Sequence, residues 1–269
     1  MHLSPHTRTA IYIALRSRFL WLGGCLFLVL LLAAFLASQF SGRQAATVAL
    51  DVGLSVIRLS LPIVVILMTQ QLLSAELERR YIFNSISYPH CRSSFLYGRV
   101  AAGAALTLGL LLVFSAALAL LVSLISNTYP QGTPVALGTP YLIVVAFIGL
   151  DIMLINAVAA LLAIIASTPS FVLVGTLGFM LVARSFGAII ELLTYDSGVV
   201  SDAESYRSNL GLLSYLLPDL GALDVRMIAL YGQLDYLPSD WPWLVLSTLT
   251  YTVGLLGLAD RALQGKRFV

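Results

Sequence analysis

Four ionisable residues lie within or at the ends of long apolar stretches: Arg58, Asp151, Arg184 and Glu191. An ionisable side chain is costly in the hydrocarbon part of a bilayer, so it needs a partner of opposite charge or a wet cavity. Asp151 lies 17 residues before Thr168 and Arg184 lies 16 residues after it, so both reach the same depth if the two helices are antiparallel around that turn. The spacing therefore predicts a salt bridge between Asp151 and Arg184.

A second pair is predicted between Arg58 and Glu191. Glu191 follows Arg184 by seven residues, which places both on one helix face, with Glu191 nearer the outer end, where Arg58 is also expected. The alternative is that these four charges line a substrate path or relay protons, as in a secondary transporter. Two positive and two negative signs favour structural pairing over that alternative.

Other kinds of chemistry find little support in the sequence. His90 and Cys91 are adjacent and lack a second pair of ligands, which makes a poor zinc site. The three histidines all map to the cytoplasmic side of the topology predicted below, which argues against a His-dependent membrane-embedded enzyme. The chain has no phosphate-binding loop, and its only lysine is Lys266. We expect no catalytic residues, no metal and no ATP hydrolysis by this chain itself.

The composition predicts a membrane protein. Hydrophobic residues make up 59% of the chain and charged residues only 10%, whereas soluble domains carry about 25% charged residues. No basic run is long enough to suggest nucleic-acid binding. Cys25 lies in an apolar stretch and Cys91 in a charged loop, so no disulfide is predicted.

The apolar segments predict an all-α membrane protein with six transmembrane helices, because each segment is long enough to span a bilayer as a helix. The predicted spans are 19–40, 52–74, 100–125, 140–166, 171–193 and 241–259. A cleaved secretory signal is the alternative for the first span, but Phe19 to Phe40 is too long for a signal core.

The segments between these spans also have predicted structures. Residues 1–18 form an amphipathic helix on the membrane surface, with basic residues on one side (Arg8, Arg16 and Arg18) and apolar residues on the other (Ile11, Tyr12 and Leu15). Residues 41–51 form a short polar loop. Residues 194–240 form an acidic segment with two short surface helices, one before and one after Pro218.

The distribution of basic residues predicts the orientation, because cytoplasmic loops retain Lys and Arg. With both termini inside, ten basic residues are cytoplasmic and only three, Arg43, Arg207 and Arg226, are outside. The ten are Arg8, Arg16, Arg18, Arg79, Arg80, Arg92, Arg99, Arg261, Lys266 and Arg267. This places residues 75–99 in the cytoplasm and residues 194–240 outside.

The loop at 75–99 has the pattern of a helix, a break and a re-entry. Glu76 precedes Arg80 by four residues, which is the favourable order for a helical ion pair. Pro89 ends that helix, since the residue before a proline is pushed out of the α region. Ser93 or Ser94 can then cap the helix that enters the third span.

This loop resembles the cytoplasmic loop of type 2 ABC transporter permeases, the six-span membrane subunits that work with a separate ATPase. The matching positions are Glu76, Glu78, Arg80, Ile82, Ile86, Ser87, Pro89, Arg92, Phe95, Leu96, Gly98 and Arg99. Thr9 to Trp21 is similar to the family's elbow helix, and Tyr215 to Gly232 to the external segment before the last span in some members.

The resemblance implies a permease subunit of an ATP-driven exporter in the cytoplasmic (inner) membrane. It implies two ATPase subunits as partners, which hold the ATP and Mg²⁺, and a second permease chain, most simply in a homodimer. The implied ATPase-coupling interface consists of Glu76, Glu78, Arg80, Tyr81, Ile82, Phe83, Ile86, Ser87, Pro89 and Arg92.

Overall fold

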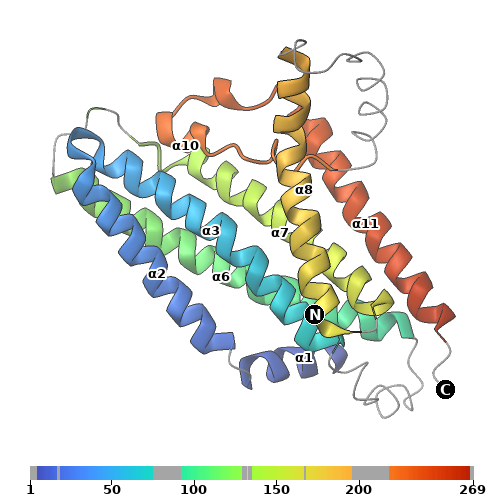
Figure 1. Ribbon diagram of the computed structural model, residues 1–269. Coiled ribbons are helices and arrows are strands. Elements are labelled where there is room, and N and C mark those ends of the chain that lie inside the picture. The colour runs from blue at the N-terminus through green and yellow to red at the C-terminus, as the bar shows by residue number, and fades with distance from the viewer. Residues whose placement is uncertain are drawn as a thin grey trace.

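The computed structural model describes residues 5–16, 19–74, 92–128, 132, 135–166, 168–195 and 218–266, with the backbone alone described for residues 5, 6, 92 and 186–195. Within these ranges all regular secondary structure is helical (Figure 1). Five described helices are long and apolar enough to cross a membrane, which indicates a multi-pass membrane protein. These are Phe19–Phe40, Gly42–Ser74, Ser93–Thr128, Thr139–Ile165 and Trp241–Gly265.

The first two long helices are joined by a tight turn. Helix α2 (Phe19–Phe40) leads through the 3₁₀ turn η1 (Gly42–Gln44) into α3 (Ala45–Thr69). Gly42 has a φ of 56°, a left-handed backbone that glycine adopts without steric cost. The predicted polar loop at 41–51 is therefore wrong in its second part. Helix α3 already begins at Ala45, because the small residues that follow are buried in the main core.

The remaining long helices begin or end close to the predicted spans. Helix α6 (Arg92–Thr128) extends the third span at both ends, and α7 (Thr139–Ile165) and α8 (Pro169–Tyr195) lie within one or two residues of the fourth and fifth. Helix α11 (Trp241–Gly265) begins at the predicted residue and runs one and a half turns further. The helices continue into polar residues beyond the apolar spans, because intrahelical hydrogen bonds still satisfy the backbone there.

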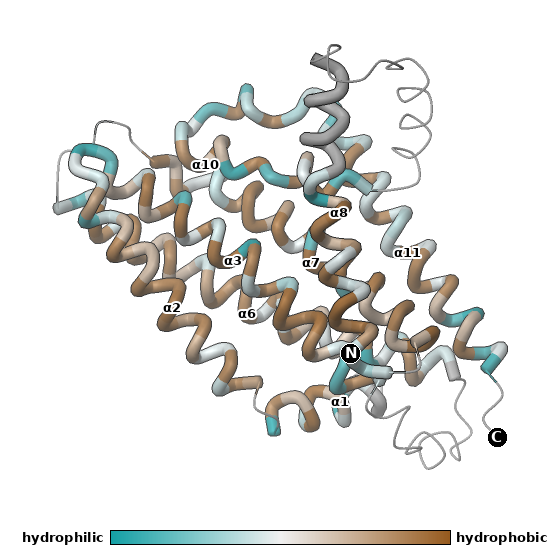
Figure 2. The backbone as a smooth tube through the Cα atoms, in the orientation of Figure 1, coloured by the Kyte–Doolittle hydropathy of each residue, from teal (hydrophilic) through white to brown (hydrophobic). Residues whose placement is uncertain are grey.

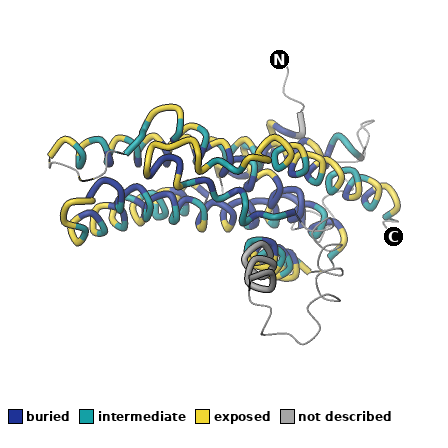
Figure 3. The backbone as a smooth tube through the Cα atoms, turned by 90° about the horizontal axis from the view of Figure 1, so that it is seen from above, coloured by how far each residue is buried: buried dark blue, intermediate teal, exposed yellow. Residues whose placement is uncertain are grey.

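Helices α3 and α7 form the centre of the bundle. Helix α3 packs against α2, α6 and α7, and α7 also contacts α8 and α11. Most residues in the apolar windows of α3 and α7 are buried, whereas most of those in α2 and α11 are not. Buried residues accordingly lie between two layers of helices (Figure 3). Apolar residues, in brown, run along the long helices, and polar residues, in teal, gather towards their ends (Figure 2). Arg58 in the middle of α3 and Asp151 on α7 are accordingly only 13% and 1% exposed.

The N-terminal helix α1 (Pro5–Arg16) packs through small residues. Ala10 and Ala14 are buried, and α1 contacts α6, α2 and the turn at the end of α3. The predicted division of its faces is wrong, because Arg8 lies over the ring of Tyr12, with 5.8 Å between the guanidinium carbon and the ring centroid. Residues four apart share a helix face, so Arg8 and Tyr12 cannot lie on opposite sides.

Both described chain ends lie at one end of the bundle (Figure 1). Gln264 Nε2 donates to Ser93 Oγ at 3.2 Å, and Lys266 Nζ donates to the Ile164 carbonyl at 2.5 Å. Helix α1 contacts η2 (Gln70–Ser74), the π-helical turn that ends α3. The two chain segments that flank residues 75–91 therefore lie at the same end as α1 and the C-terminal end of α11.

The segment before α11 differs from its prediction. Beyond Pro218 it contains only the short helix α10 (Met227–Tyr231) and the 3₁₀ turn η3 (Leu234–Tyr236), and residues 218–226 are irregular. Leu220, Leu223 and Val225 are buried in the main core. The segment thus inserts apolar side chains between helices instead of lying on a surface. The predicted helix before Pro218 lies outside the described residues.

Candidate functional site

Pro62 frees a backbone carbonyl in α3 that binds one arginine of a charged cluster. Pro62 lies inside α3 and has no backbone N–H, so the carbonyl of Arg58, four residues earlier, loses its helical partner. Arg184 Nη2 on α8 donates to that carbonyl at 3.1 Å. The same Nη2 lies 2.6 Å from Asp151 Oδ2 on α7, and the Asp151 side chain is only 1% exposed. The structure thus brings together the two residues for which the turn spacing predicts a salt bridge.

Arg58 joins this pair to the irregular segment before α10. Its Nη1 forms an ion pair with Asp224, and its Nε lies 3.9 Å from Asp151 Oδ2. Its Nη2 donates to the Leu220 carbonyl at 2.7 Å, and the Leu220 N–H donates to the carbonyl of Ala183 at 3.2 Å. Arg58 therefore satisfies irregular backbone inside the bundle, which a membrane protein can hold only where protein or water supplies such partners.

The predicted pairing of Arg58 with Glu191 stays a prediction, because the side chain of Glu191 lies outside the described part of the chain. The sequence analysis did not identify Asp224 as a partner of Arg58. A signal was present in the alternation of apolar and charged residues from Leu223 to Met227. Its periodicity does not reveal which helix the segment contacts.

Arg226 extends the cluster towards solvent. Its Nη1 lies 3.0 Å from Asp51 Oδ1 and 2.6 Å from Ser55 Oγ, and its Nε lies 3.5 Å from Asp224 Oδ2. Exposure rises along the cluster from 1% at Asp151 to 46% at Asp51. We call these six residues the charge network: Asp51, Arg226, Asp224, Arg58, Asp151 and Arg184. It contains three positive and three negative side chains that alternate in sign, so it is neutral as a whole.

A pocket of about 510 Å³ opens beside the charge network. Its lining comes from α3, α8 and the segment after Pro218: Ser55, Arg58, Leu59, Arg184, Gly221, Asp224 and Arg226. This volume falls within the range of small-molecule sites. All three arginines of the network line this pocket, but only one of its aspartates does.

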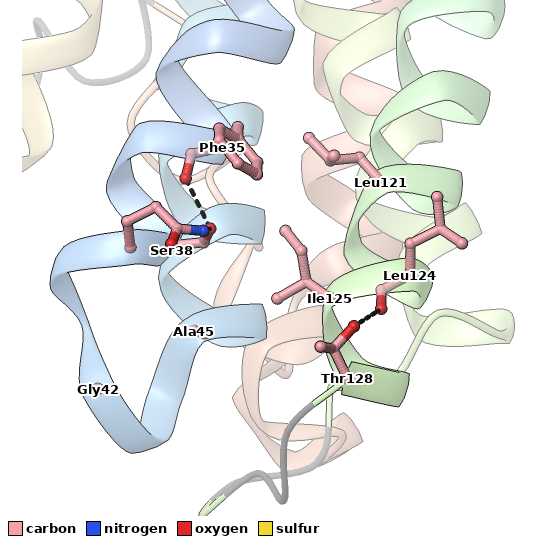
Figure 4. A pocket seen from close by; sticks show the side chains of 9 residues that line it. Phe35, Ser38, Gly42, Ala45, Leu121, Leu124, Ile125 and Thr128 are labelled. Atoms are coloured by element: carbon pink, nitrogen blue, oxygen red, sulfur yellow. Dashed lines mark hydrogen bonds between the residues drawn. The ribbon is translucent and has the colours of Figure 1, made fainter.

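Two other described pockets offer less chemistry. One of about 510 Å³ lies between α2 and α6 (Figure 4). The hydroxyls of Ser38 and Thr128 in it donate to carbonyls of their own helices, at 2.6 and 2.8 Å, and the other labelled side chains are apolar. A pocket of about 1000 Å³ runs along α11 and is mainly apolar. Both are suited to acyl chains more than to a specific polar ligand.

The described residues contain no group of three or more His, Cys, Asp or Glu side chains placed to hold a metal ion. The predicted ATPase-coupling residues from Glu76 to Pro89, and the side chain of Arg92, lie outside the described part of the chain. What the structure describes is the two attachment points of that loop, at Ser74 and Arg92.

The end of α3, five residues before the attachment point at Ser74, is linked to other helices by hydrogen bonds. Thr69 Oγ1, one residue before the π-helical turn η2, donates to Asn156 Oδ1 on α7 at 2.9 Å. Asn156 Nδ2 in turn donates to the Val100 carbonyl on α6 at 3.2 Å. The last turn of α3 is therefore linked to α6 and α7 through Asn156.

Comparison with models of known protein families finds no match to the chain, and a search of curated proteins finds none either. The family resemblance accordingly depends on the loop and flanking segments described in the sequence analysis.

Proposed function

We propose that this chain is the permease subunit of an ATP-driven exporter of the type 2 ABC class, in the cytoplasmic (inner) membrane of a bacterium. Two copies, or one copy and a homologue, would form the substrate path. Two separate ATPase subunits would bind ATP and Mg²⁺ and drive the path through the 76–88 segment. This chain would itself be non-catalytic.

The observation that carries the proposal is the position of the loop attachment points. Ser74 and Arg92 lie at the bundle end that also holds α1 and the last turn of α11, and the described part of that end is rich in basic residues. These are Arg8, Arg16, Arg99, Arg261 and Lys266. An excess of basic residues is typical of a cytoplasmic face, where an ATPase would have to dock.

Helix α8 supports a sixth span. It runs over 27 residues, which corresponds to about 40 Å of helix, longer than the roughly 30 Å of a bilayer core. Its first 17 residues, Pro169–Ser185, are mainly apolar, and Arg184 is their only charged residue. With α8 counted, the chain crosses six times, and α1 and the C-terminal end of α11 lie on one side.

Deletion of residues 76–88 tests the proposal. We expect the deletion to abolish co-purification of an ATPase with the tagged chain from native membranes, together with ATP-dependent transport by vesicles. Glu76→Ala combined with Glu78→Ala should weaken the association, because it removes the charges that the resemblance places in the interface. Asp235→Ala combined with Asp240→Ala, at the opposite end of the bundle, is the matched control and should change neither. Full association and transport after the deletion would reject the proposal.

A secondary transporter is the second candidate, and one observation favours it. Asp151 Oδ1 is buried and has no hydrogen-bond partner among the described residues, which is a feature of carboxylates that exchange protons. Proton-coupled uptake in vesicles without ATP, abolished by Asp151→Asn, would support this candidate over the first.

A further inference from the structure

The pocket beside the charge network has a positively charged wall. Three arginines and one aspartate line it, so positive side chains exceed negative ones by two. The other two aspartates of the network do not line the pocket. Asp151 lies behind the arginines and is buried, and Asp51 lies at the outer edge. A ligand in the pocket would therefore contact three guanidinium groups and the carboxylate of Asp224.

The arginines retain hydrogen-bonding capacity for a ligand. A guanidinium carries five N–H donors in a planar fork that matches carboxylate and phosphate oxygens. Arg184 makes both of its described polar contacts through Nη2 and lines the pocket with its side chain 20% exposed. The Ser55 hydroxyl in the same wall is already engaged, because it donates to the Asp51 carbonyl at 2.8 Å and accepts from Arg226 Nη1 at 2.6 Å.

The backbone opposite the arginines is held close by a glycine. A Cβ at Gly221 would lie 3.0 Å from the Arg184 carbonyl oxygen and 3.0 Å from Asp219 Oδ1. A larger residue there would require one of these neighbours to move by a few tenths of an ångström. Asp219 Oδ1 also accepts the N–H groups of Gly221 and Ala222, at 2.9 and 3.1 Å. The wall therefore has a fixed backbone on one side and the arginine side chains on the other.

One of the internal ion pairs is weak enough to be exchanged. Arg226 and Asp51 are 37% and 46% exposed, and ion pairs of that exposure contribute little to stability. A doubly charged oxyanion in the pocket would compete with Asp51 for Arg226. The same anion could not displace Asp151, which is enclosed by Arg58 and Arg184.

We propose that this pocket binds a phosphate group, either free or as part of a larger molecule such as a lipid headgroup. Phosphate monoesters carry a charge of about −1.5 to −2 at neutral pH, and three of the four charged side chains that line the pocket are arginines. Arg58, Arg184 and Arg226 bind the oxygens, and Asp51 competes for Arg226. The site does not depend on coupling to an ATPase.

Equilibrium binding of radiolabelled inorganic phosphate to the purified full chain in a neutral detergent, at constant ionic strength, tests the proposal. Arg226→Gln should weaken binding roughly tenfold or more, the usual effect of losing a charged hydrogen-bond donor. Asp51→Asn should tighten it, because the competing carboxylate is gone. Arg43→Gln, an exposed arginine at the same end of the bundle and outside the pocket, should leave it unchanged.

A second experiment, with the chain in lipid nanodiscs, distinguishes a lipid headgroup from a soluble phosphate as the ligand. Thermal stabilisation by phosphatidic acid over phosphatidylcholine, lost in Arg226→Gln, identifies a lipid headgroup, whereas saturable binding of inorganic phosphate alone identifies a soluble ligand. Either result supports the site. The proposed site would be overturned if neither phosphatidic acid nor inorganic phosphate bound. It would also be overturned if the Asp51→Asn chain were less stable and bound phosphate no more tightly. The charge network would then have only a structural role.

Discussion

At the scale of single residues, arginine is the cation that this interior requires. Arg58 contacts two carboxylates and a backbone carbonyl at once, through three different nitrogens. A lysine has one nitrogen and could not hold these partners in a fixed plane. The freed carbonyl above Pro62 gives Arg184 a neutral acceptor in addition to Asp151. The cluster is therefore held by directional hydrogen bonds as well as by charge.

The Asp151–Arg184 pair should behave as one unit in stability. Removal of one partner from a buried ion pair costs about 3–5 kcal/mol, because the other charge is left buried and unpaired. We expect Asp151→Asn and Arg184→Gln each to lower the unfolding temperature in detergent micelles, and the double variant to lose less than the two single losses combined. Asp235→Asn, an exposed aspartate in η3, is the control and should have little effect. Additive losses would show that the pair contributes no coupling.

At the scale of elements, the packing of α3 against α6 depends on a glycine. A Cβ at Gly53 would lie 3.1 Å from Leu118 Cγ and closer still to both of its δ-methyl groups. Leu118 is fully buried, so it has little room to move away. The two helices can approach this closely only because position 53 has no side chain.

Substitution of Gly53 should destabilise the contact between α3 and α6. We expect Gly53→Ala to lower the free energy of unfolding by about 1–3 kcal/mol, the usual cost of an overpacked core. Measurements would use denaturation in mixed micelles followed by circular dichroism. Addition of Leu118→Ala should recover part of the loss. Gly109→Ala on α6, where a Cβ would meet nothing within 4 Å, is the matched control. Equal behaviour of the two glycines would contradict this account of the crossing.

At the scale of the whole molecule, the described loops divide between two ends. The carbonyl of Arg43 accepts from the N–H of Gly132 at 2.9 Å, and the N–H of Ala136 donates to the carbonyl of Ala229 at 3.0 Å. These contacts place η1, the 132–138 connection and α10 together, opposite α1 and the last turn of α11 (Figure 1). In the proposed orientation the end with α1 and the last turn of α11 faces the cytoplasm, because it carries the basic residues.

Thiol labelling checks that orientation. Cys25 lies within α2, so a Cys25→Ser chain keeps Cys91 in the loop as its only thiol. We expect a membrane-impermeant maleimide to label this chain in inside-out vesicles and to leave it unlabelled in right-side-out vesicles. A chain with Ser239→Cys and without both native cysteines is the control and should show the reverse pattern. Labelling of Cys91 from outside would show that the topology is the inverse of the predicted one. It would also exclude a cytoplasmic ATPase partner at this loop.

The sequence by itself determined where the long helices lie and which two charges share a depth. Backbone groups in a bilayer must be satisfied within their own segment, so an apolar run of sufficient length is a helix in almost any context. The short turn at Thr168 fixed the register between Asp151 and Arg184, because counting residues suffices for adjacent antiparallel helices.

Only the tertiary structure decided the partners of Arg58 and Arg226. Arg58 on α3 reaches a carbonyl 162 residues away, in the irregular segment after Pro218. Arg226 in that segment reaches a carboxylate on α3, 175 residues away. The alternation of apolar and charged residues in the segment does not predict either contact. The start of α3 at Ala45 agrees with the high helix propensity of alanine, but only the tertiary structure shows that Ala45, Ala46 and Ala49 are buried there. Contacts between distant segments depend on how the whole bundle packs, and local sequence patterns do not encode that packing.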